Sequence, residues 1–261
     1  MRTLAFRGLR LPRVGAMRGG ILAPYFWDSF PSPKRVHDAQ SISSLSQANG
    51  QQVANWVDVG GLSLAAYSQT GGGGTGVTVA TTNGLKYVQG GGAGGGYLEA
   101  SANTDLRGAE VWVLFKMGMG DNRIASNQDG GNIWIRSAHG DLRIIFGQVL
   151  YGVVGKNIES SYNLTADQWY VVRLVFSESD GLRLWLDEIL ATEIGGNFST
   201  SPTATFKIPR LLADAAGNTG DAGVAFIGVF PAPGETAALT AAQVASAWAN
   251  LGALRDTFNG V

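Results

Sequence analysis

Carboxylates and histidines are the side chains that could make this chain an enzyme, and their spacing forms no catalytic set. Retaining glycoside hydrolysis needs two carboxyl groups about 5 Å apart. The nearest candidate is Asp187 and Glu188 with Glu193, but Asp187 and Glu188 are adjacent and would point to opposite faces of a strand. His139 lies in a predicted turn, without a G-x-S-x-G nucleophile motif anywhere. His37 lies near the N-terminus, outside the predicted domain, so we expect no enzymatic activity.

Metal and cofactor chemistry has equally little support. The chain has no cysteine, which excludes disulfides, Cys-ligated zinc and a thiol nucleophile. The glycine run 71–74 is not followed by Gly-Lys-Ser or Gly-Lys-Thr, so it is not a phosphate loop. We expect no cofactor except a calcium ion, for which the weak candidate ligands are the loop residues Asp121, Asp129 and Asp221.

Aromatic side chains that could stack on the apolar face of a sugar are the remaining candidates for binding. They lie in or beside predicted hairpins, where alternation along a strand leaves one side chain of each neighbouring pair facing outward. Most tryptophans of a sandwich belong to its core, which is the competing interpretation. The weak candidates are Trp134, Tyr151, Tyr162 and Trp185.

Composition bounds the fold and the partners. The chain has 261 residues, of which 45% are hydrophobic and 15% charged, with a net charge of −1. A chain with so few basic residues is not built to neutralise phosphates, so we expect no nucleic-acid partner. No apolar run approaches the roughly 20 residues of a membrane helix, so we expect no membrane partner either. The 38 glycines favour a β structure rich in turns.

Alternation and turn signals predict about ten strands. Residues 109–116 are apolar on both faces, which is typical of a central strand covered on both sides. Turn signals at Asn83-Gly84, His139-Gly140-Asp141 and Ser179-Asp180-Gly181 predict hairpins. The other predicted strands are 77–81, 85–88, 97–100, 132–137, 142–147, 170–177, 182–186, 206–208 and 224–230, and residues 41–56 are expected to form a short helix or a loop.

The period changes near the C-terminus. Thr240 and Gln243 form a capping-box pattern. Val244, Trp248 and Leu251 then recur on one helical face, which predicts a short helix at 240–254 with Trp248 docked on the sandwich.

The first 40 residues differ from the rest, because they are basic, interrupted by proline and glycine, and free of acids before Asp28. We expect an extended N-terminal arm at 1–40 that docks on its own domain or on a partner, with 41–261 as the sandwich. A disordered tail is the alternative, and a transit peptide is disfavoured by the glycines. The expected partner-binding residues are Arg2, Arg7, Arg10, Arg13, Arg18, Tyr25, Phe26 and Trp27.

Five motifs in order, from Trp56 to Ala253, resemble the laminin-G/concanavalin A-like lectin domain of the bacterial and phage type. They are Trp56-x-Asp58-x-Gly60, Gly96-Tyr97-Leu98-Glu99, the strand 111–116, Gln168-Trp169-Tyr170 with Leu182–Asp187, and Ile227–Phe230 with Leu239–Val244. Asp187-Glu188 replaces the family's Asp-Gly turn, and Gln243 replaces its glutamate. The resemblance implies an all-β, two-sheet antiparallel jelly-roll sandwich. Glucanases of this fold carry E-x-D-x-x-E on one strand, which this chain lacks.

Three functional hypotheses follow from the resemblance and the arm. The first is a structural or decoration protein of a phage virion (a head or tail component), made in the host bacterial cytoplasm. It would attach to capsid, portal or tail proteins through residues 1–40, form a homo-oligomer and display a sandwich that binds host surface polysaccharide. The alternative is a bacterial carbohydrate-binding module, and the least favoured is a glycoside hydrolase. Deleting residues 1–36 should then leave the sandwich folded but abolish assembly.

Overall fold

The computed structural model describes most of the chain from Tyr25 to the C-terminus. The described residues are 25–31, 33, 35–60, 66–71, 75–101, 108–118, 124–126, 133–138, 141–146, 158–159, 164–177, 181–194, 210–213 and 219–261.

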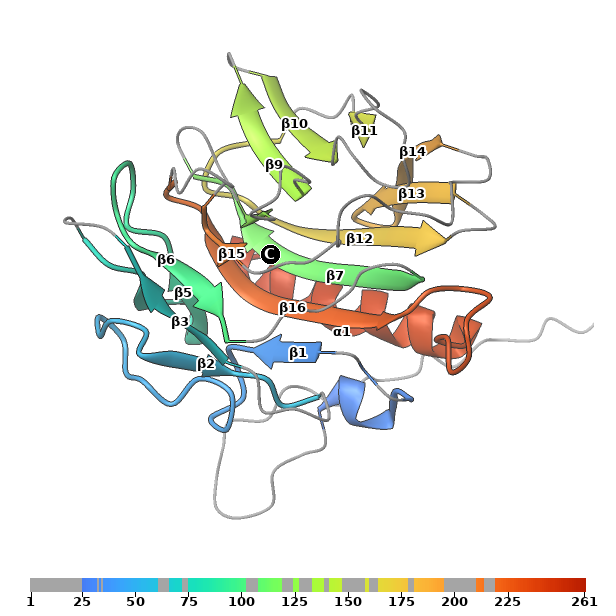
Figure 1. Cartoon of the computed structure of the whole chain (residues 1–261), viewed down its shortest axis with the longest axis horizontal. Coiled ribbons are helices and arrows are strands. Elements are labelled where there is room, and N and C mark those ends of the chain that lie inside the picture. Colours follow the sequence, from blue (N-terminus) through green and yellow to red (C-terminus); the bar gives the residue numbers. More distant parts are fainter. Residues whose placement is uncertain are drawn as a thin grey trace, which may run out of the picture.

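Sixteen strands, one short 3-10 helix and one α-helix make up the described part of the chain (Figure 1). The two helical elements are η1 (Phe26–Ser29) and α1 (Ala241–Asn259). The strands are β1 (Arg35–Asp38), β2 (Asn55–Val57), β3 (Ala66–Thr70), β4 (Thr78–Thr82), β5 (Leu85–Gln89), β6 (Tyr97–Ala100), β7 (Ala109–Lys116), β8 (Ala125–Ser126), β9 (Ile133–Ala138), β10 (Asp141–Phe146), β11 (Ile158–Glu159), β12 (Trp169–Ser177), β13 (Gly181–Leu186), β14 (Ile189–Ile194), β15 (Arg210–Leu211) and β16 (Gly223–Pro231).

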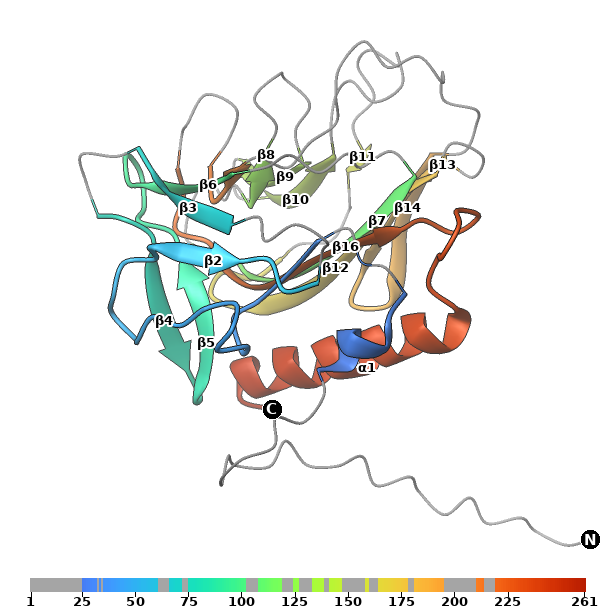
Figure 2. The ribbon, with the colours of Figure 1, turned by 60° about the horizontal axis from the view of Figure 1, so that its bottom comes forward.

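The strands form an antiparallel sandwich, as the sequence predicted. The large sheet has the order β14-β13-β12-β7-β16-β5-β4, and β1 also pairs with β16. The opposite layer contains a small five-stranded sheet, β2-β3-β6-β15-β8, and a three-stranded sheet, β11-β10-β9. Figure 2 shows the resulting three layers, with the large sheet in the middle and α1 below it.

The central strand β7 is buried on both faces, which confirms the prediction for residues 109–116. Val111, Val113 and Phe115 point to the inner core between the sheets. Trp112 and Leu114 point to the outer face, where they pack beneath α1 and η1. The large sheet therefore needs an apolar cover on each side.

Helix α1 supplies most of the outer cover. Thr240 and Gln243 form the predicted capping box. The ring of Trp248 packs edge-on against Trp112 at 4.6 Å, which confirms the predicted docking. The helix continues beyond the predicted end at 254 because Phe258 extends its buried face. The ring of Phe258 stacks on that of Trp169, with 3.9 Å between the ring centroids. It ends in the left-handed residue Gly260.

The residues from Tyr25 onward belong to the sandwich, so the expected boundary of the arm at residue 40 lies too far along the chain. Trp27 in η1 is buried, and its indole Nε1 donates to Asp38 Oδ2 at 3.1 Å. Phe26 and Phe30 contact Phe226 and Phe230 of β16. The arm was expected to dock on its own domain or on a partner, and for these aromatic residues the structure shows the first: they cover the large sheet. The five arginines of the expected arm lie outside the described residues.

The Trp56-x-Asp58-x-Gly60 motif holds β1 in place. Trp56 is fully buried in the inner core. Asp58 Oδ1 accepts hydrogen bonds from the backbone N–H groups of Val36 in β1 and of Gly60. A Cβ atom at Gly60 would lie 2.5 Å from Val36, so only glycine allows this close approach. The polar members of the motif therefore fix a strand that the sequence analysis had placed in the arm.

His37 was placed outside the domain, and this is wrong: it lies in β1 and is fully buried. Its ring lies 4.7 Å from that of Tyr67 and 5.5 Å from that of Trp56, centroid to centroid. Burial, and then the nearby charge of Arg35, lower the pKa of His37 well below its usual value. The imidazole is therefore neutral at physiological pH.

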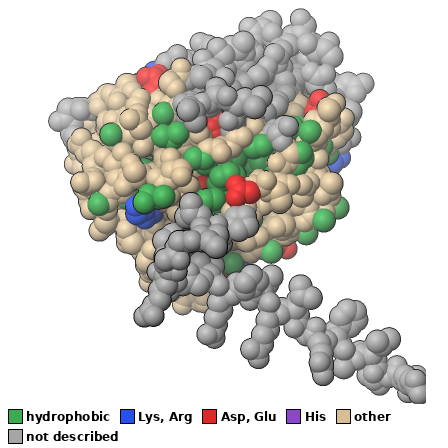
Figure 3. Space-filling model, turned by 90° about the horizontal axis from the view of Figure 1, so that it is seen from below, with side chains coloured by type: hydrophobic (Ala, Val, Ile, Leu, Met, Phe, Trp, Pro, Cys, Tyr) green, Lys and Arg blue, Asp and Glu red, His purple; other side chains and the backbone are tan. Residues whose placement is uncertain are grey.

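None of the helices that the structure describes is both long and apolar enough to span a membrane. On the face shown in Figure 3, charged side chains are few and scattered, in keeping with the 15% charged composition.

We predict that deleting residues 1–38 unfolds the protein, whereas deleting residues 1–24 does not. The longer deletion removes β1 together with Trp27, Phe30 and Val36, each of which is at least nine-tenths buried. Losing three such core side chains would exceed the usual stability of a domain. Circular dichroism and urea unfolding of the two truncated chains would check this. A folded 39–261 chain would refute the assignment of β1 to the sandwich.

We also predict that His37 makes the protein less stable in acid. Because the folded state binds the His37 proton less readily than the unfolded state, the stability it contributes is complete above about pH 6.5. That stability is lost as the pH falls below this value, by up to about 1.4 kcal/mol per pH unit. Urea unfolding between pH 7.5 and 5.5 should show that the unfolding free energy of His37→Gln depends less on pH than that of the unsubstituted chain. His139→Gln, which removes the other histidine, should keep the dependence of the unsubstituted chain.

Candidate functional site

Trp185 is the sugar-stacking candidate whose side chain the structure describes. Trp134 lies in β9, but its side chain falls outside the description, as do Tyr151 and Tyr162 altogether. Trp185 lies in β13 near the edge of the large sheet and is half-buried. It is therefore the starting point for building the site.

Arg173 lies between Trp185 and a second tryptophan on the outer face of the large sheet. The strand register places Arg173 of β12 opposite Trp185 of β13 on one side and opposite Trp112 of β7 on the other. Its guanidinium carbon is 4.8 Å from the ring centroid of Trp185 and 5.2 Å from that of Trp112. The cation therefore lies between two indole rings, which attract it through their negative faces.

Glu110 neutralises the charge of Arg173 through a buried ion pair. It is fully buried in β7, and its Oε2 accepts hydrogen bonds from Arg173 Nε at 3.1 Å and from a terminal guanidinium nitrogen at 2.5 Å. Its Oε1 accepts from the indole Nε1 of Trp112 at 3.0 Å. These contacts lock Arg173 and Trp112 in one geometry. We call Glu110, Trp112, Arg173, Trp185 and Trp248 the tryptophan–arginine cluster.

The flank of α1 forms the second side of the cluster. Trp248, Gly252 and Arg255 follow one another along this flank, at spacings of four and three residues. A Cβ atom at Gly252 would meet only the guanidinium of Arg255, 4.0 Å away, so the helix carries no side chain between Trp248 and Arg255. Gly252 therefore adds no side chain to the flank of α1 that faces solvent between Trp248 and Arg255.

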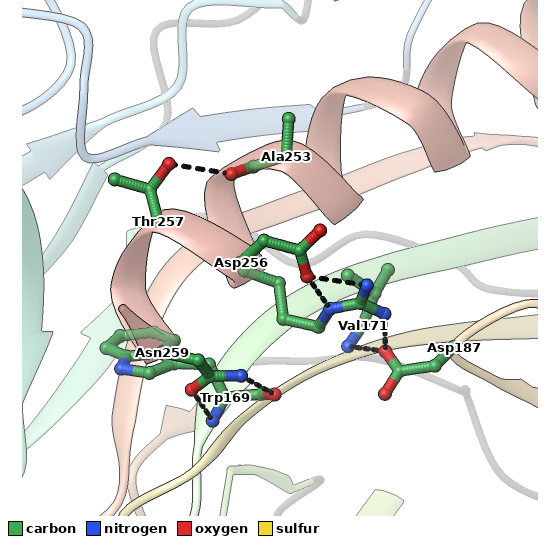
Figure 4. A network of polar contacts seen from close by, with 8 residues as sticks. Trp169, Val171, Asp187, Ala253, Asp256, Thr257 and Asn259 are labelled. Atoms are coloured by element: carbon green, nitrogen blue, oxygen red, sulfur yellow. Dashed lines mark hydrogen bonds and ion pairs between the residues drawn. The ribbon is translucent and has the colours of Figure 1, made fainter. Parts of the chain in front are cut away.

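Arg255 ties the helix to the turn between β13 and β14. It lies 2.9 Å from Asp187 of the turn and 2.7 Å from Asp256 of the helix. Partial burial opposes the charge of Arg255, but the two carboxylates prevail and raise its pKa. Figure 4 shows Asp187 also accepting from the backbone of Val171. Asp187 and Glu188 form the predicted turn, both with positive φ.

These residues offer what a sugar requires. Trp185 and Trp248 are half-buried, and Leu190, opposite Trp185 in the register, is 46% exposed. Glu110 engages Nε and one terminal nitrogen of Arg173, a residue that is 8% exposed, and the other terminal nitrogen carries N–H groups that can donate. The carboxylate oxygens of Asp187 and Asp256 add hydrogen-bond acceptors. Apolar rings with a few fixed polar groups are typical of small-molecule sites.

Catalysis and metal binding find no matching arrangement in the described part of the chain. Its acidic and histidine side chains nowhere gather in threes around a point where a metal could lie. Asp221 lies beside β16, where its backbone carbonyl accepts a hydrogen bond from Gln89, while Asp121 and Asp129 fall outside the described residues. Calcium binding therefore stays a prediction.

The outward face of the small sheet is the competing surface for a ligand. Tyr97 of β6 is half-buried, and the guanidinium of Arg210 lies 5.0 Å from its ring centroid. Arg210 also pairs with Glu99 at 3.4 Å. Both side chains of this pair are more exposed than those of Arg173 and Glu110, so solvent weakens their attraction and holds the geometry less firmly.

Sequence reasoning identified Trp185 but missed its partners. Arg173 and Glu110 interrupt runs that are otherwise apolar on both faces, and a charged residue in such a run signals a buried partner. The partner itself depends on the register of β7, β12 and β13, which the sequence does not specify. Trp248 was predicted only as a docking residue.

Comparisons with known proteins identify the fold. Neither a protein-family model nor a curated protein matches the sequence. Domain 4 of AbnA, an extracellular arabinanase from Geobacillus stearothermophilus, solved with arabinotriose, has a TM-score of 0.55 at 12% identity, covering 84% of this chain and 98% of that domain. The binding domain of botulinum neurotoxin serotype D has a TM-score of 0.53 at 10% identity. The same domain in complex with N-acetylneuraminic acid has a TM-score of 0.51 at 11% identity.

These similarities confirm the concanavalin-like jelly-roll sandwich that the motifs predicted. The match covers 84% of this chain but only about half of the toxin domains, 52% and 51%. The arabinanase domain is matched over nearly its whole length. Neither protein supports a phage origin.

We predict that Glu110→Gln lowers the free energy of unfolding by about 3 kcal/mol, because it leaves the nearly buried Arg173 without its counter-charge. Asp256→Asn is the control, since this carboxylate is 45% exposed beside its arginine. It should cost less than about 1 kcal/mol. Urea unfolding of both variants measures the difference, and equal losses would contradict the role given to Glu110.

Proposed function

We propose that this chain is a carbohydrate-binding β-sandwich without enzymatic activity, and that it binds sugar at the tryptophan–arginine cluster. The observation that carries the proposal is the half-buried Trp185, whose ring lies against an arginine that is itself fixed by the buried Glu110. A ring and a donor held in place before binding lose little conformational entropy when a ligand arrives.

The cluster suits a sugar because a sugar ring has an apolar C–H face and a polar rim of hydroxyls. The C–H face would stack on the exposed part of Trp185. Hydroxyl groups at the rim would accept hydrogen bonds from Arg173 and donate them to Asp187. Buried polar groups that meet a hydroxyl in fixed geometry give most of the selectivity of such sites.

The arabinanase comparison supports this proposal more strongly than the toxin comparison. The arabinanase domain is matched over 98% of its length and was solved with arabinotriose. The toxin domain is matched over about half of its length, so the part that resembles this chain need not be the part that holds its sugar. Both similarities concern fold alone, and the argument for binding rests on the cluster.

The absence of enzymatic activity is part of the proposal. Glu110 is fully buried beneath Arg173, so it cannot reach a substrate. Asp187 is engaged by Arg255 and by the backbone of Val171. A hydrolase would need two carboxyl groups free to act on opposite sides of one glycosidic bond.

A virion role would add assembly to sugar binding. It would require residues 1–24, with Arg2, Arg7, Arg10, Arg13 and Arg18, to bind capsid, portal or tail proteins. These residues lie outside the described part of the chain, so attachment, homo-oligomer formation and location in a virion stay predictions.

We predict that Trp185→Ala weakens binding of an oligosaccharide at least about tenfold, equivalent to 1.4 kcal/mol, because it removes the stacking surface. A glycan array would identify the ligand, with arabino-oligosaccharides among the probes, and calorimetry would measure the affinity. Tyr97→Ala is the matched control, since it removes a half-buried aromatic ring from the outward face of the small sheet.

Both variants should keep the melting temperature of a folded sandwich. If Tyr97→Ala loses affinity and Trp185→Ala does not, the sugar binds to the small sheet and the proposed site is wrong. If the unsubstituted chain binds no glycan on the array, the proposed function is wrong.

A further inference from the structure

We infer that the tryptophan–arginine cluster selects uncharged sugars and disfavours sugars that carry a carboxylate. This inference rests on the proposed function and deepens it, because it names the chemical class of the ligand. It follows from how the charges around Trp185 are already paired.

The guanidinium group inside the cluster, of Arg173, and the one beside it, of Arg255, both have their charge neutralised within the protein. Arg173 forms a hydrogen-bonded ion pair with Glu110, which has no other cation within bonding distance among the described residues. Arg255 is shared between two carboxylates, Asp187 at 2.9 Å and Asp256 at 2.7 Å. An acidic ligand would have to compete with a carboxylate that is already in place.

The charged residues that the structure describes beside the cluster add no net positive charge. Glu188 is exposed in the turn that follows β13. Arg183 lies on the same face of β13 as Trp185, two residues away, and already has an interaction of its own. Glu110, Asp187, Glu188 and Asp256 therefore outnumber Arg173, Arg183 and Arg255 by one, so the described charged residues in and beside the cluster are together slightly negative.

The polar atoms that remain suit hydroxyl groups. Carboxylate oxygens of Asp187 and Asp256 accept hydrogen bonds, which a sugar hydroxyl can donate and an ionised carboxylate cannot. The guanidinium N–H groups donate to either. A neutral sugar can therefore satisfy both kinds of group, whereas a sugar carboxylate would face unpaired acceptors and like charge.

This charge distribution distinguishes the ligands of the two similar folds. Arabinotriose is a neutral sugar, and N-acetylneuraminic acid carries a carboxylate. A sugar of the second kind is bound more strongly where a guanidinium or ammonium group without a competing carboxylate can form a charge-assisted hydrogen bond with it. The cluster has the opposite balance.

The experiment uses the full chain and matched pairs of neutral and uronic-acid oligosaccharides of the same length and linkage, for several pentoses and hexoses. We expect the best neutral member to bind at least about tenfold more tightly than its acidic partner, by calorimetry at low salt. Because the repulsion is electrostatic, the ratio should shrink in 1 M salt, where the Debye length is about 3 Å.

Asp187→Asn is the informative variant. It removes one negative charge, keeps the oxygen that accepts from Val171, and suits the positive φ of 45° at this position. The ratio of neutral to acidic affinity should fall severalfold. Glu99→Gln, which removes a carboxylate from the small sheet, should leave the ratio unchanged.

Three outcomes separate the two claims. Preference for neutral sugars that decreases in Asp187→Asn supports the inference. Equal or tighter binding of the acidic members overturns the inference but leaves the proposed function standing. Failure of every pair to bind overturns the proposed function and the inference with it.

Discussion

The need to cover both faces of one sheet determines the architecture of this protein. β7, β12 and β16 are buried along almost their whole length, on the inner and on the outer face. At about 25 cal/mol per Å² of apolar surface, leaving either face to solvent would cost more than the stability of a typical domain. The opposing strands cover the inner face, and α1 with η1 covers the outer face. The chain needs its first described segment and its last one to complete the same cover.

The candidate site lies where the outer cover ends. Beneath the helix the outer positions of the sheet are apolar, as at Leu114 and Val171. One row further lie Trp112, which Trp248 of α1 still contacts, and then Arg173 and Trp185, where α1 contacts β12 more extensively than β13. A sheet that passes from a buried to a solvent-facing outer surface requires side chains with an apolar body and a polar end. The same property makes such a row suited to a ligand with one apolar face.

The sequence specified the elements whose signals are local and left unspecified those that depend on pairing. Alternation and the Asn83-Gly84 turn predicted the hairpin of β4 and β5, and the Thr240–Gln243 pattern predicted the start of α1. β1 escaped prediction because four residues, three of them charged or histidine, do not resemble a buried strand. Its place depends on the pairing with β16 and on Asp58. Arg173 and Glu110 likewise meet only through the register of two strands distant in sequence.

The buried ion pair of the cluster is better explained by geometry than by stability. Two apolar side chains in place of Arg173 and Glu110 would pack as stably, because burying two charges costs about as much as their attraction returns. The pair instead fixes a flat cation between two indole rings and orients the Trp112 N–H. Arginine retains about 2 kcal/mol of rotamer entropy when its side chain is free. Here the folding of the sheet has already removed that freedom, so a ligand that stacks on Trp185 would meet a donor whose position no longer has to be established on binding.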